Sequence, residues 1–361
     1  MSASYKATGI NLKGVPMGEN DRLLTVLTAE YGLIRAIAPG SRKHESSLRG
    51  RSGVFVVNHL LLIKGKSLDK IIQAESIASY PGLSQDLGKL TAAQYLAELV
   101  LYQAMGDQPQ SVLFGLIQAY LSALEGAQAD GVLPLLVEGM VTLLRLAGVA
   151  PEVNLCAVTR QPLRQTRTDG WQVGFHPSAG GVVSLAAFEQ ICDRERRFRG
   201  SSGDPSFPND PAIPHNGERF GGGERFGSGA IAPSALSAGG NPPLSRRVRQ
   251  STAPYRAAPP VAGTRLTAAE WQLLRQVATR DAMAAKNTTL PTDFSYAQGS
   301  YAQGSYAQGD CAPDTYAQET WLAVERSLRY YAQYHFERLI QSASLIDACF
   351  APLPSTLLPP A

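Results

Sequence analysis

The sequence predicts an α+β protein of several domains, in which an N-terminal five-stranded β-barrel of the oligonucleotide-binding (OB) type precedes an α-helical domain. The first observation is a run of short apolar segments, separated by Gly, Pro or charged turns, over residues 4–80. The second is an apolar period of three to four residues that begins near residue 83. The third is the low complexity of two later stretches. Together they also predict a small β knob and long disordered insertions within the helical domain.

The barrel is predicted from five segments with strand composition and no helix of useful length between them. These segments are SYKATGINLKG, RLLTVLTAEYG, LIRAIAPG, GVFVVNHLLLIKG and LDKIIQAESIASY. Five short strands at this close spacing fit an OB-type barrel, although the strand count alone does not separate it from an SH3-like barrel. We assign residues 1–82 to this domain.

The helical domain is predicted to begin with three amphipathic helices in residues 83–154. Their sequences are LSQDLGKLTAAQYLAELVLYQA, SVLFGLIQAYLSALEGA and LPLLVEGMVTLLRLAGV. Gly148 and Pro151 stand where the third helix is expected to stop. Residues 155–193 then alternate in hydrophobicity around a Gly pair, which predicts a compact hairpin knob.

Two insertions are expected to interrupt the rest of this domain. Residues 194–263 are dominated by Gly, Ser, Pro and Asn, so they cannot bury enough apolar surface to offset chain ordering. A helix is predicted at 264–282, where Thr267 and Glu270 have the spacing of a capping box. Residues 283–318 contain the repeat SYAQG, which favours a disordered insertion over a tyrosine array that binds bases or other copies. A single long helix is predicted at 319–350, closing one helical core.

Charge is concentrated in the barrel. The whole chain has a net charge of +3, but eleven Lys and Arg stand against six Asp and Glu between Tyr5 and Tyr80. This excess suits a polyanion or an acidic protein as partner, and charge alone is equally consistent with an ordinary solvated surface. Only Phe55 is aromatic between residues 35 and 70, which favours backbone contact with weak sequence preference. The candidate nucleic-acid-binding residues are Arg35, Arg42, Lys43, Arg49, Arg51, Lys64 and Lys66.

Nothing in the sequence indicates catalysis, a cofactor or a membrane partner. No nucleophile elbow, zinc-protease motif or phosphate-binding loop occurs, and the five His are scattered; His335 is expected to be a boundary residue rather than a base. The four Cys form no close pair and no secretory leader is recognisable, which predicts a reducing, cytoplasmic location. The longest apolar cluster, HLLLIKG, is far shorter than the ~20 residues of a membrane span.

An ordered series of motifs runs over residues 4–192. Its N-terminal residues are Gly9, Ile10, Gly18, Glu19, Asn20, Asp21, Arg22, Thr28, Gly32, Arg35, Gly40, Arg42, Lys43, Ser47, Leu48 and Gly50. The series continues through LLRLAGVAPEVNLC and is followed by HFERLIQSASLI in the final helix. This ordered series resembles the bacterial recombination-repair RecO family.

The resemblance implies an OB-fold barrel, a helical domain and a zinc-finger-like knob. It implies a protein that binds single- and double-stranded DNA and anneals complementary strands. It also implies that the protein acts with RecR, and often RecF, to load the recombinase RecA on DNA covered by single-strand-binding protein. The acidic C-terminal tail of that binding protein is then expected to dock on the helical domain. A nucleoid-associated, cytoplasmic protein follows from the same resemblance.

The sequence departs from the family pattern at two places. Cys156 stands at the first zinc-ligand position, but Thr159, Ser184 and Ala187 occupy the other three, so a degenerate knob without zinc is expected. Some relatives also carry an Arg two residues before the glutamate of the third helix, and it grips the partner's terminal carboxylate. Leu136 takes that place here, so the tail site is expected to use other cations. The candidates are Arg145 and Arg164.

Two other function classes remain open on the sequence. One is a protein-interaction adaptor whose barrel contacts an acidic partner without annealing DNA. The other is an RNA-directed OB-fold protein, which a preference for strands with 2′-hydroxyls would reveal.

Overall fold

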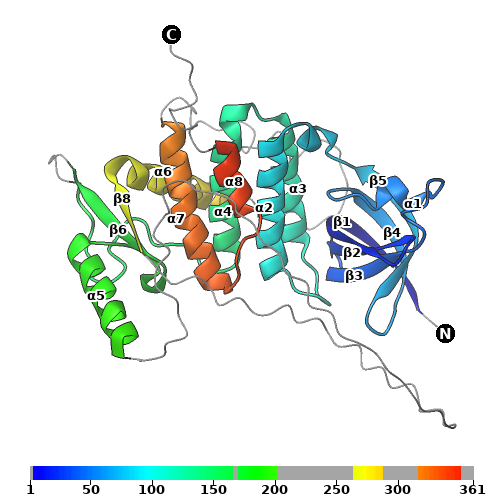
Figure 1. The fold of residues 1–361 in the computed structure, drawn as a ribbon, viewed down its shortest axis with the longest axis horizontal. Helices are drawn as coiled ribbons and strands as arrows, with labels where there is room; N and C mark the ends of the chain where they lie inside the picture. The colour runs from blue at the N-terminus through cyan, green and yellow to red at the C-terminus, as the bar shows by residue number, and fades with distance from the viewer. Residues whose placement is uncertain (1–2, 166–169, 202–262, 288–315, 351–361) are drawn as a thin grey trace, which may run out of the picture. The chain divides into compact units, whose positions relative to one another are not determined.

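The structure is a computed structural model that describes residues 3–165, 170–201, 263–287 and 316–350 (Figure 1). The predicted insertions 194–263 and 283–318, including every SYAQG copy, lie largely outside these residues. The chain divides into two compact units. One comprises Met1–Arg194 and Ala258–Ala361, and the other comprises Glu195–Ala257, of which only residues 195–201 are described.

The predicted OB-type barrel is confirmed. Its strands close in the order β1-β2-β3-β5-β4, and the only parallel pairing among them joins β3 to β5, at Ala36–Asp69 and Ile37–Lys70. A four-residue helix, α1, lies between β3 and β4. The elements are β1 (Ser4–Met17), β2 (Asp21–Thr28), β3 (Gly32–Ala38), α1 (Leu48–Arg51), β4 (Val57–Ile63) and β5 (Asp69–Ala78).

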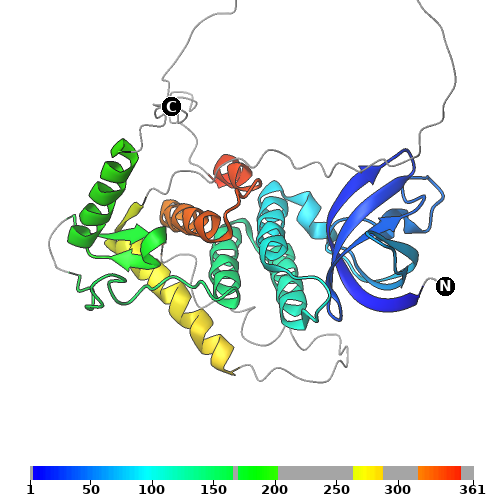
Figure 2. The same cartoon turned by 90° about the horizontal axis from the view of Figure 1, so that it is seen from below.

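Alternation along the strands divides the barrel's apolar residues into two sets. In β3, Ile34 and Ala36 point into the barrel while Arg35 between them is exposed. Ile10 and Leu27 belong instead to a larger cluster that they share with the helices. The barrel therefore has its own core and one apolar outer face, which packs against α2 and α3 (Figures 1 and 2).

The three predicted helices are confirmed as α2 (Leu87–Gln103), α3 (Ser111–Gly126) and α4 (Val132–Leu146). Single turns of 3-10 helix precede α2 at Pro81–Gln85 and α4 at Ala129–Gly131. Asp86 caps α2 by accepting the backbone N–H of Lys89 over 2.9 Å. The later helices α6 (Ala268–Asn287) and α7 (Gln318–Phe336) pack on α4, and α8 (Ala343–Phe350) packs on α2. One apolar cluster runs through all of these helices.

The knob is a three-stranded sheet in the order β7-β6-β8, with a helix beside it. Its hairpin, β6 (Gln172–His176) and β7 (Gly181–Val183), confirms the prediction. A short 3-10 helix, Pro177–Ala179, and the left-handed Gly180 (φ 83°) turn the chain between the two strands. The remaining elements are α5 (Leu185–Ser201) and β8 (Thr264–Thr267).

Three element predictions were wrong in part. The first residues of the helix predicted at 264–282 form β8, because Leu266 is buried and the segment pairs with β6; the helix itself ends at Asn287. The capping box is confirmed, since Thr267 N–H donates to Glu270 and Glu270 N–H to Thr267. The ordered structure that was expected to end at residue 193 continues to Ser201, because helix α5 extends that far.

The single helix predicted at 319–350 is two helices, α7 and α8. Glu337 ends α7 in the left-handed conformation, with φ 52°. Glu98 of α2 then accepts the backbone N–H groups of Gln341 (2.7 Å) and Ser342 (3.2 Å). A tertiary contact therefore supplies partners that a continuous helix would have supplied. Among the helices within the described ranges, none has the length and apolar character needed to cross a membrane.

Candidate nucleic-acid interface

Four of the predicted cations lie in the β3–β4 connection, residues 39–56. Arg42 joins this connection to the β1–β2 turn, because its backbone N–H donates to Asn20 O over 2.8 Å and its Nη1 donates to Gly18 O over 3.0 Å. The N–H of Gly40 donates to Asp21 Oδ1 over 2.7 Å in the same place. The two connections are therefore held together, with Arg42 and Lys43 exposed beside them.

Helix α1 is anchored to the barrel by two buried amides. Asn11 of β1 and Asn58 of β4 are fully buried, and their Nδ2 groups donate to Arg51 O over 2.8 and 3.0 Å. Leu48 inserts into the barrel core. Because the backbone of α1 is fixed in this way, Arg49 is held outward and Arg51, half-buried, donates to Ser47 O over 3.1 Å.

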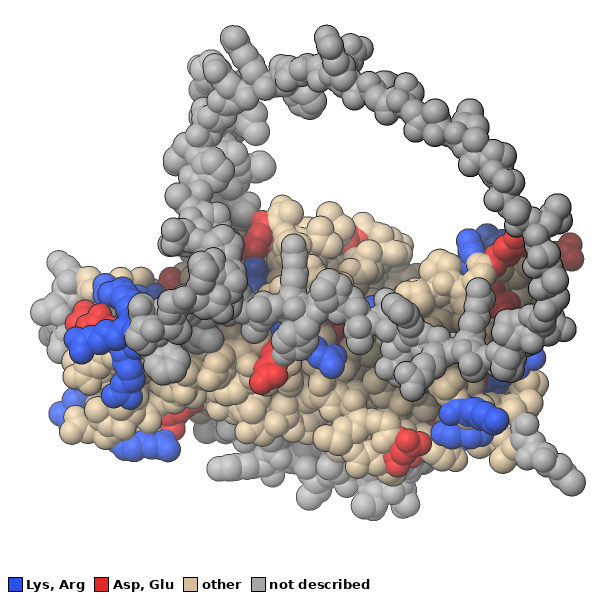
Figure 3. All heavy atoms as spheres, turned by 60° about the horizontal axis from the view of Figure 1, so that its bottom comes forward, with Lys and Arg blue, Asp and Glu red and all other residues tan. Residues whose placement is uncertain are grey.

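The other three cations lie apart from this group. Arg35 is exposed on the outer face of β3. Lys64 and Lys66 lie in the β4–β5 connection, residues 64–68, and Lys64 Nζ is 3.5 Å from Asp107 Oδ1 in the α2–α3 loop. On the face drawn in Figure 3, Lys and Arg at the barrel end, on the right, form separate groups rather than one stripe. The structure thus places four of the predicted cations on the β3–β4 connection, two on the β4–β5 connection and Arg35 on β3.

The aromatic residue within the predicted window cannot stack on a base. Phe55 is 4% exposed and packs in the cluster shared with the helices. Two tyrosines outside that window are better placed. Tyr5 and Tyr31 have ring centroids 4.9 Å apart, and Tyr31 is 40% exposed. Sequence reasoning missed this pair because Tyr5 begins β1 and Tyr31 lies in the turn after β2, so only the barrel brings them together.

Comparisons with known proteins agree with the fold. The family models described as Recombination protein O N terminal and Recombination protein O C terminal match residues 1–80 and 84–196. A DNA repair protein RecO from Nostoc sp. is 40% identical over 355 residues, covering 97% of this chain and 98% of the relative. The chain belongs to the RecO family. That membership gives it a role in recombinational DNA repair.

Two more relatives show how the similarity is distributed. The RecO of Trichodesmium erythraeum is 50% identical over 193 residues, which is 51% of this chain and 67% of that protein. The RecO of Thermosynechococcus vestitus is 32% identical over 354 residues, covering 98% of each chain.

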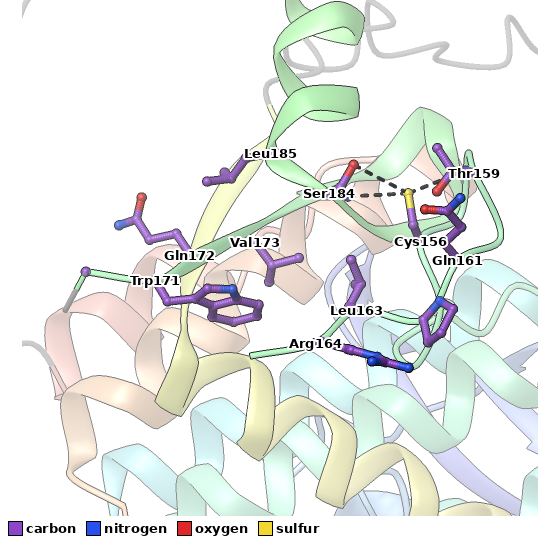
Figure 4. A pocket seen from close by; sticks show the side chains of 12 residues that line it. Cys156, Thr159, Gln161, Leu163, Arg164, Trp171, Gln172, Val173, Ser184 and Leu185 are labelled. Carbon is purple, nitrogen blue, oxygen red and sulfur yellow. Dashed lines mark hydrogen bonds between the residues drawn. The ribbon is translucent and has the colours of Figure 1, made fainter. Parts of the chain in front are cut away.

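In the RecO knob of this chain, Thr159 and Ser184, two of the positions expected to have lost a zinc ligand, lie beside the thiol of Cys156 (Figure 4). Cys156 Sγ accepts the backbone N–H groups of Thr159 (3.5 Å) and Ser184 (3.3 Å) and lies 3.9 Å from Ser184 Oγ. Burial alone would raise the pKa of Cys156, but these hydrogen bonds outweigh it and lower the pKa to about 7. One thiol, two hydroxyls and the methyl group of Ala187 do not make a tetrahedral zinc site. In the parts of the chain that are described, no cluster of three His, Cys, Asp or Glu could hold a metal.

The two arginines expected to bind a RecO partner's tail have different surroundings. Arg145 of α4 is half-buried and its Nη2 donates to Ala278 O over 2.7 Å; burial lowers its pKa. Arg164 is exposed and lines a cavity of about 530 Å³ together with Leu163 and Trp171 (Figure 4). Leu136, two residues before Glu138 on α4, is fully buried.

Proposed function

We propose that the chain is a non-enzymatic recombination mediator that anneals complementary DNA strands and helps load RecA on single-stranded DNA covered by single-strand-binding protein. The observation that carries the proposal is the set of cations on the connections of a closed OB-type barrel, in a chain of the RecO family. An OB barrel with cations along its loops is a common support for single-stranded nucleic acid.

The proposed mechanism is charge neutralisation. Lys and Arg that contact the phosphates of two strands lower the repulsion that opposes pairing, and each contact contributes about −0.7 to the salt slope for a single strand. Within the described residues no acid pairs with Arg35, Lys43 or Arg49, so these cations can meet phosphates without first breaking an ion pair. The anchored backbone of α1 keeps Arg49 and Arg51 in place before DNA binds, which reduces the ordering cost.

The proposed partners are single- and double-stranded DNA, RecR, the C-terminal tail of single-strand-binding protein, and also RecF and RecA. For the acidic tail we favour Arg164 over Arg145. Arg164 is exposed at a cavity that offers apolar walls from Leu163 and Trp171, whereas Arg145 already donates to α6. A terminal carboxylate beside an apolar side chain would use both features of that cavity.

The test is strand annealing, with and without single-strand-binding protein. Reversing Arg42, Lys43, Arg49 and Arg51 to Glu together is expected to abolish annealing while circular dichroism stays that of the wild type. A smaller variant, Lys43→Glu with Arg49→Glu, spares the side-chain hydrogen bonds of Arg42 and Arg51 and is expected to weaken single-strand binding at least tenfold. Arg160→Glu, at an exposed knob residue, controls for a single charge reversal away from the barrel in the assay without single-strand-binding protein.

Annealing by the quadruple variant at the wild-type rate would reject the proposal. The same preparation separates the other function classes. Binding confined to an acidic peptide would indicate an adaptor, and a marked preference for RNA over DNA of the same sequence would indicate an RNA-directed barrel.

A further inference from the structure

Two tyrosines meet edge to face at the rim of the barrel. The rings of Tyr5 and Tyr31 are 4.9 Å apart between centroids with an interplanar angle of 71°. The turn that carries Tyr31 is fixed by Thr28, whose Oγ1 accepts the Tyr31 N–H over 3.1 Å and donates to Gly32 O over 2.8 Å. Tyr31 thus presents a 40% exposed ring from a backbone that is already ordered.

The ring of Tyr5 is anchored from behind. Its hydroxyl donates to Asp69 Oδ2, and Asp69 Oδ1 accepts the N–H of Gly65 over 2.9 Å. Asp69 is 6% exposed. Burial, followed by the bond to Asp69, raises the pKa of Tyr5 well above its usual value, so the hydroxyl remains a neutral donor. The same carboxylate therefore holds both the hydroxyl of Tyr5 and the backbone of the β4–β5 connection that carries Lys64 and Lys66.

A cation lies next to the ring of Tyr5. Lys64 Nζ is 6.0 Å from the centroid of Tyr5. Its ion pair with Asp107 joins side chains that are 56% and 92% exposed, so the pair is weak and can exchange for a phosphate. Met105 is 61% exposed, and its carbonyl accepts the Leu33 N–H beside the tyrosine turn.

An exposed aromatic ring beside a lysine provides the two contacts that a nucleotide in a single strand needs. The ring accepts the face of any base, and the lysine meets the flanking phosphate. We propose that Tyr5 and Tyr31 form a stacking site for one unpaired base, with Lys64 and Lys66 on the adjoining phosphates. This inference rests on the proposed DNA binding and names the part of the barrel that takes a base.

The site has a distinct consequence for annealing. A base stacked on Tyr31 is removed from its neighbours in the strand, while the cations of the β3–β4 connection contact only the backbone. Stacking on a protein ring is available to an unpaired base and not to one inside a duplex. The site is therefore expected to favour single strands and to release the base when pairing is complete.

The test measures binding of the full chain to fluorescent oligonucleotides by anisotropy. The probes are an oligo-dT strand and the same strand with abasic positions. The variants are Tyr31→Ala, Tyr31→Phe and, as control, Tyr330→Ala, whose ring is 45% exposed on α7. Tyr31→Ala is expected to bind oligo-dT about tenfold more weakly. Tyr31→Phe and Tyr330→Ala are expected to match the wild type, because stacking needs the ring and not its hydroxyl.

The abasic strand separates base stacking from backbone contact. The affinity of the wild type for the abasic strand is expected to be about tenfold lower than its affinity for oligo-dT, whereas Tyr31→Ala is expected to bind the two strands equally. Equal wild-type affinity for both strands, or a Tyr31→Ala variant that binds oligo-dT as the wild type does, would overturn the stacking site while leaving the DNA-binding proposal standing. Failure of the wild type to bind either strand would reject both. Equal affinity for oligo-rU would extend the site to RNA bases.

Discussion

The backbone N–H of Leu33 donates to the carbonyl oxygen of Met105 over 2.8 Å, which fastens the barrel strand β3 to the α2–α3 loop, residues 104–110. A second bond runs from the N–H of Gln110 to Ala29 O over 2.9 Å. The turn between β2 and β3 is therefore held on both sides by the helical domain. The tyrosine pair and Lys64 lie at this junction, so its order bears directly on the proposed base site.

Gly32 is the residue at which this junction is most sensitive. Its φ is 66°, and an added Cβ would press on Met105 O and lie 2.6 Å from Gln108 O, both of them backbone atoms. We expect Gly32→Ala to lower the free energy of unfolding by more than about 2 kcal/mol, measured by urea denaturation. Gly18→Ala is the matched control, since Gly18 also has a positive φ, 61°, but nothing within 4 Å of the added Cβ. Equal losses in the two variants would contradict the role of the close approach.

A buried ion network joins α7 to α8. Arg329 Nη2 lies 2.6 Å from Glu325 Oε2 and its Nη1 2.6 Å from Asp347 Oδ2, and the Glu325 side chain is fully buried. Arg329→Met would leave that carboxylate without its cation, and we expect a loss of about 3–5 kcal/mol in the free energy of unfolding at pH 7. Arg326→Met removes only the exposed contact to Asp347 and is expected to cost about 1 kcal/mol or less.

The free energy of unfolding of Arg329→Met should also depend on pH in a characteristic way. Burial raises the pKa of Glu325, and Arg329 opposes that rise. Without Arg329 the folded-state pKa rises further above the unfolded value, so the protonated form is favoured in the folded chain. The contribution of Glu325 to the stability of the variant is then greatest at low pH, and it is lost as pH rises through the folded-state pKa. Denaturation of Arg329→Met at pH 5 and pH 7 is expected to show partial recovery at pH 5. An unchanged deficit at both values would argue against an uncompensated Glu325.

Three cysteines added to the knob should create a zinc site there. Replacing Thr159, Ser184 and Ala187 by Cys would complete the ligand set around Cys156, whose thiol already contacts the first two residues. We expect the triple variant to bind one zinc per chain and its melting temperature to fall on chelation, because structural zinc contributes to folding. The wild type is expected to purify without zinc and to ignore the chelator. Stoichiometric zinc in wild-type protein by metal analysis would refute this prediction.

Asp107 is expected to restrain DNA binding. Its carboxylate lies 3.5 Å from Lys64 Nζ and would repel a phosphate there. Asp107→Asn keeps the left-handed backbone, φ 58°, that Asn tolerates well, and frees Lys64. We expect single-strand affinity to rise roughly two- to fivefold at low salt, with a steeper salt slope by up to about 0.7. Asp130→Asn, an exposed acid before α4, serves as control; a gain of the same size there would mean that net charge alone is responsible.

Much of this protein could be predicted from local pattern. Short segments of strand composition between Gly, Pro or charged turns marked the five barrel strands, and the three- to four-residue period marked α2, α3 and α4, because these signals lie within each element's own sequence. The four-residue segment at Thr264 is too short to show a period, and it became a strand only through pairing with β6. The break at Glu337 likewise depends on Glu98, a residue of another helix.

The candidate site likewise combines features that are visible in the local sequence with features that arise only from tertiary contacts. The basic character of the barrel and the cations of its loops can be read from the chain, since charge and turn residues are local properties. Folding then holds Arg42 and Arg51 against the barrel, buries Phe55 and sets Lys64 opposite Asp107. It also brought Tyr5 and Tyr31 into contact across 26 positions of chain. The physical reason is strand closure: pairing β1 with β2 and β4 fixes neighbours that no periodicity within a segment can encode.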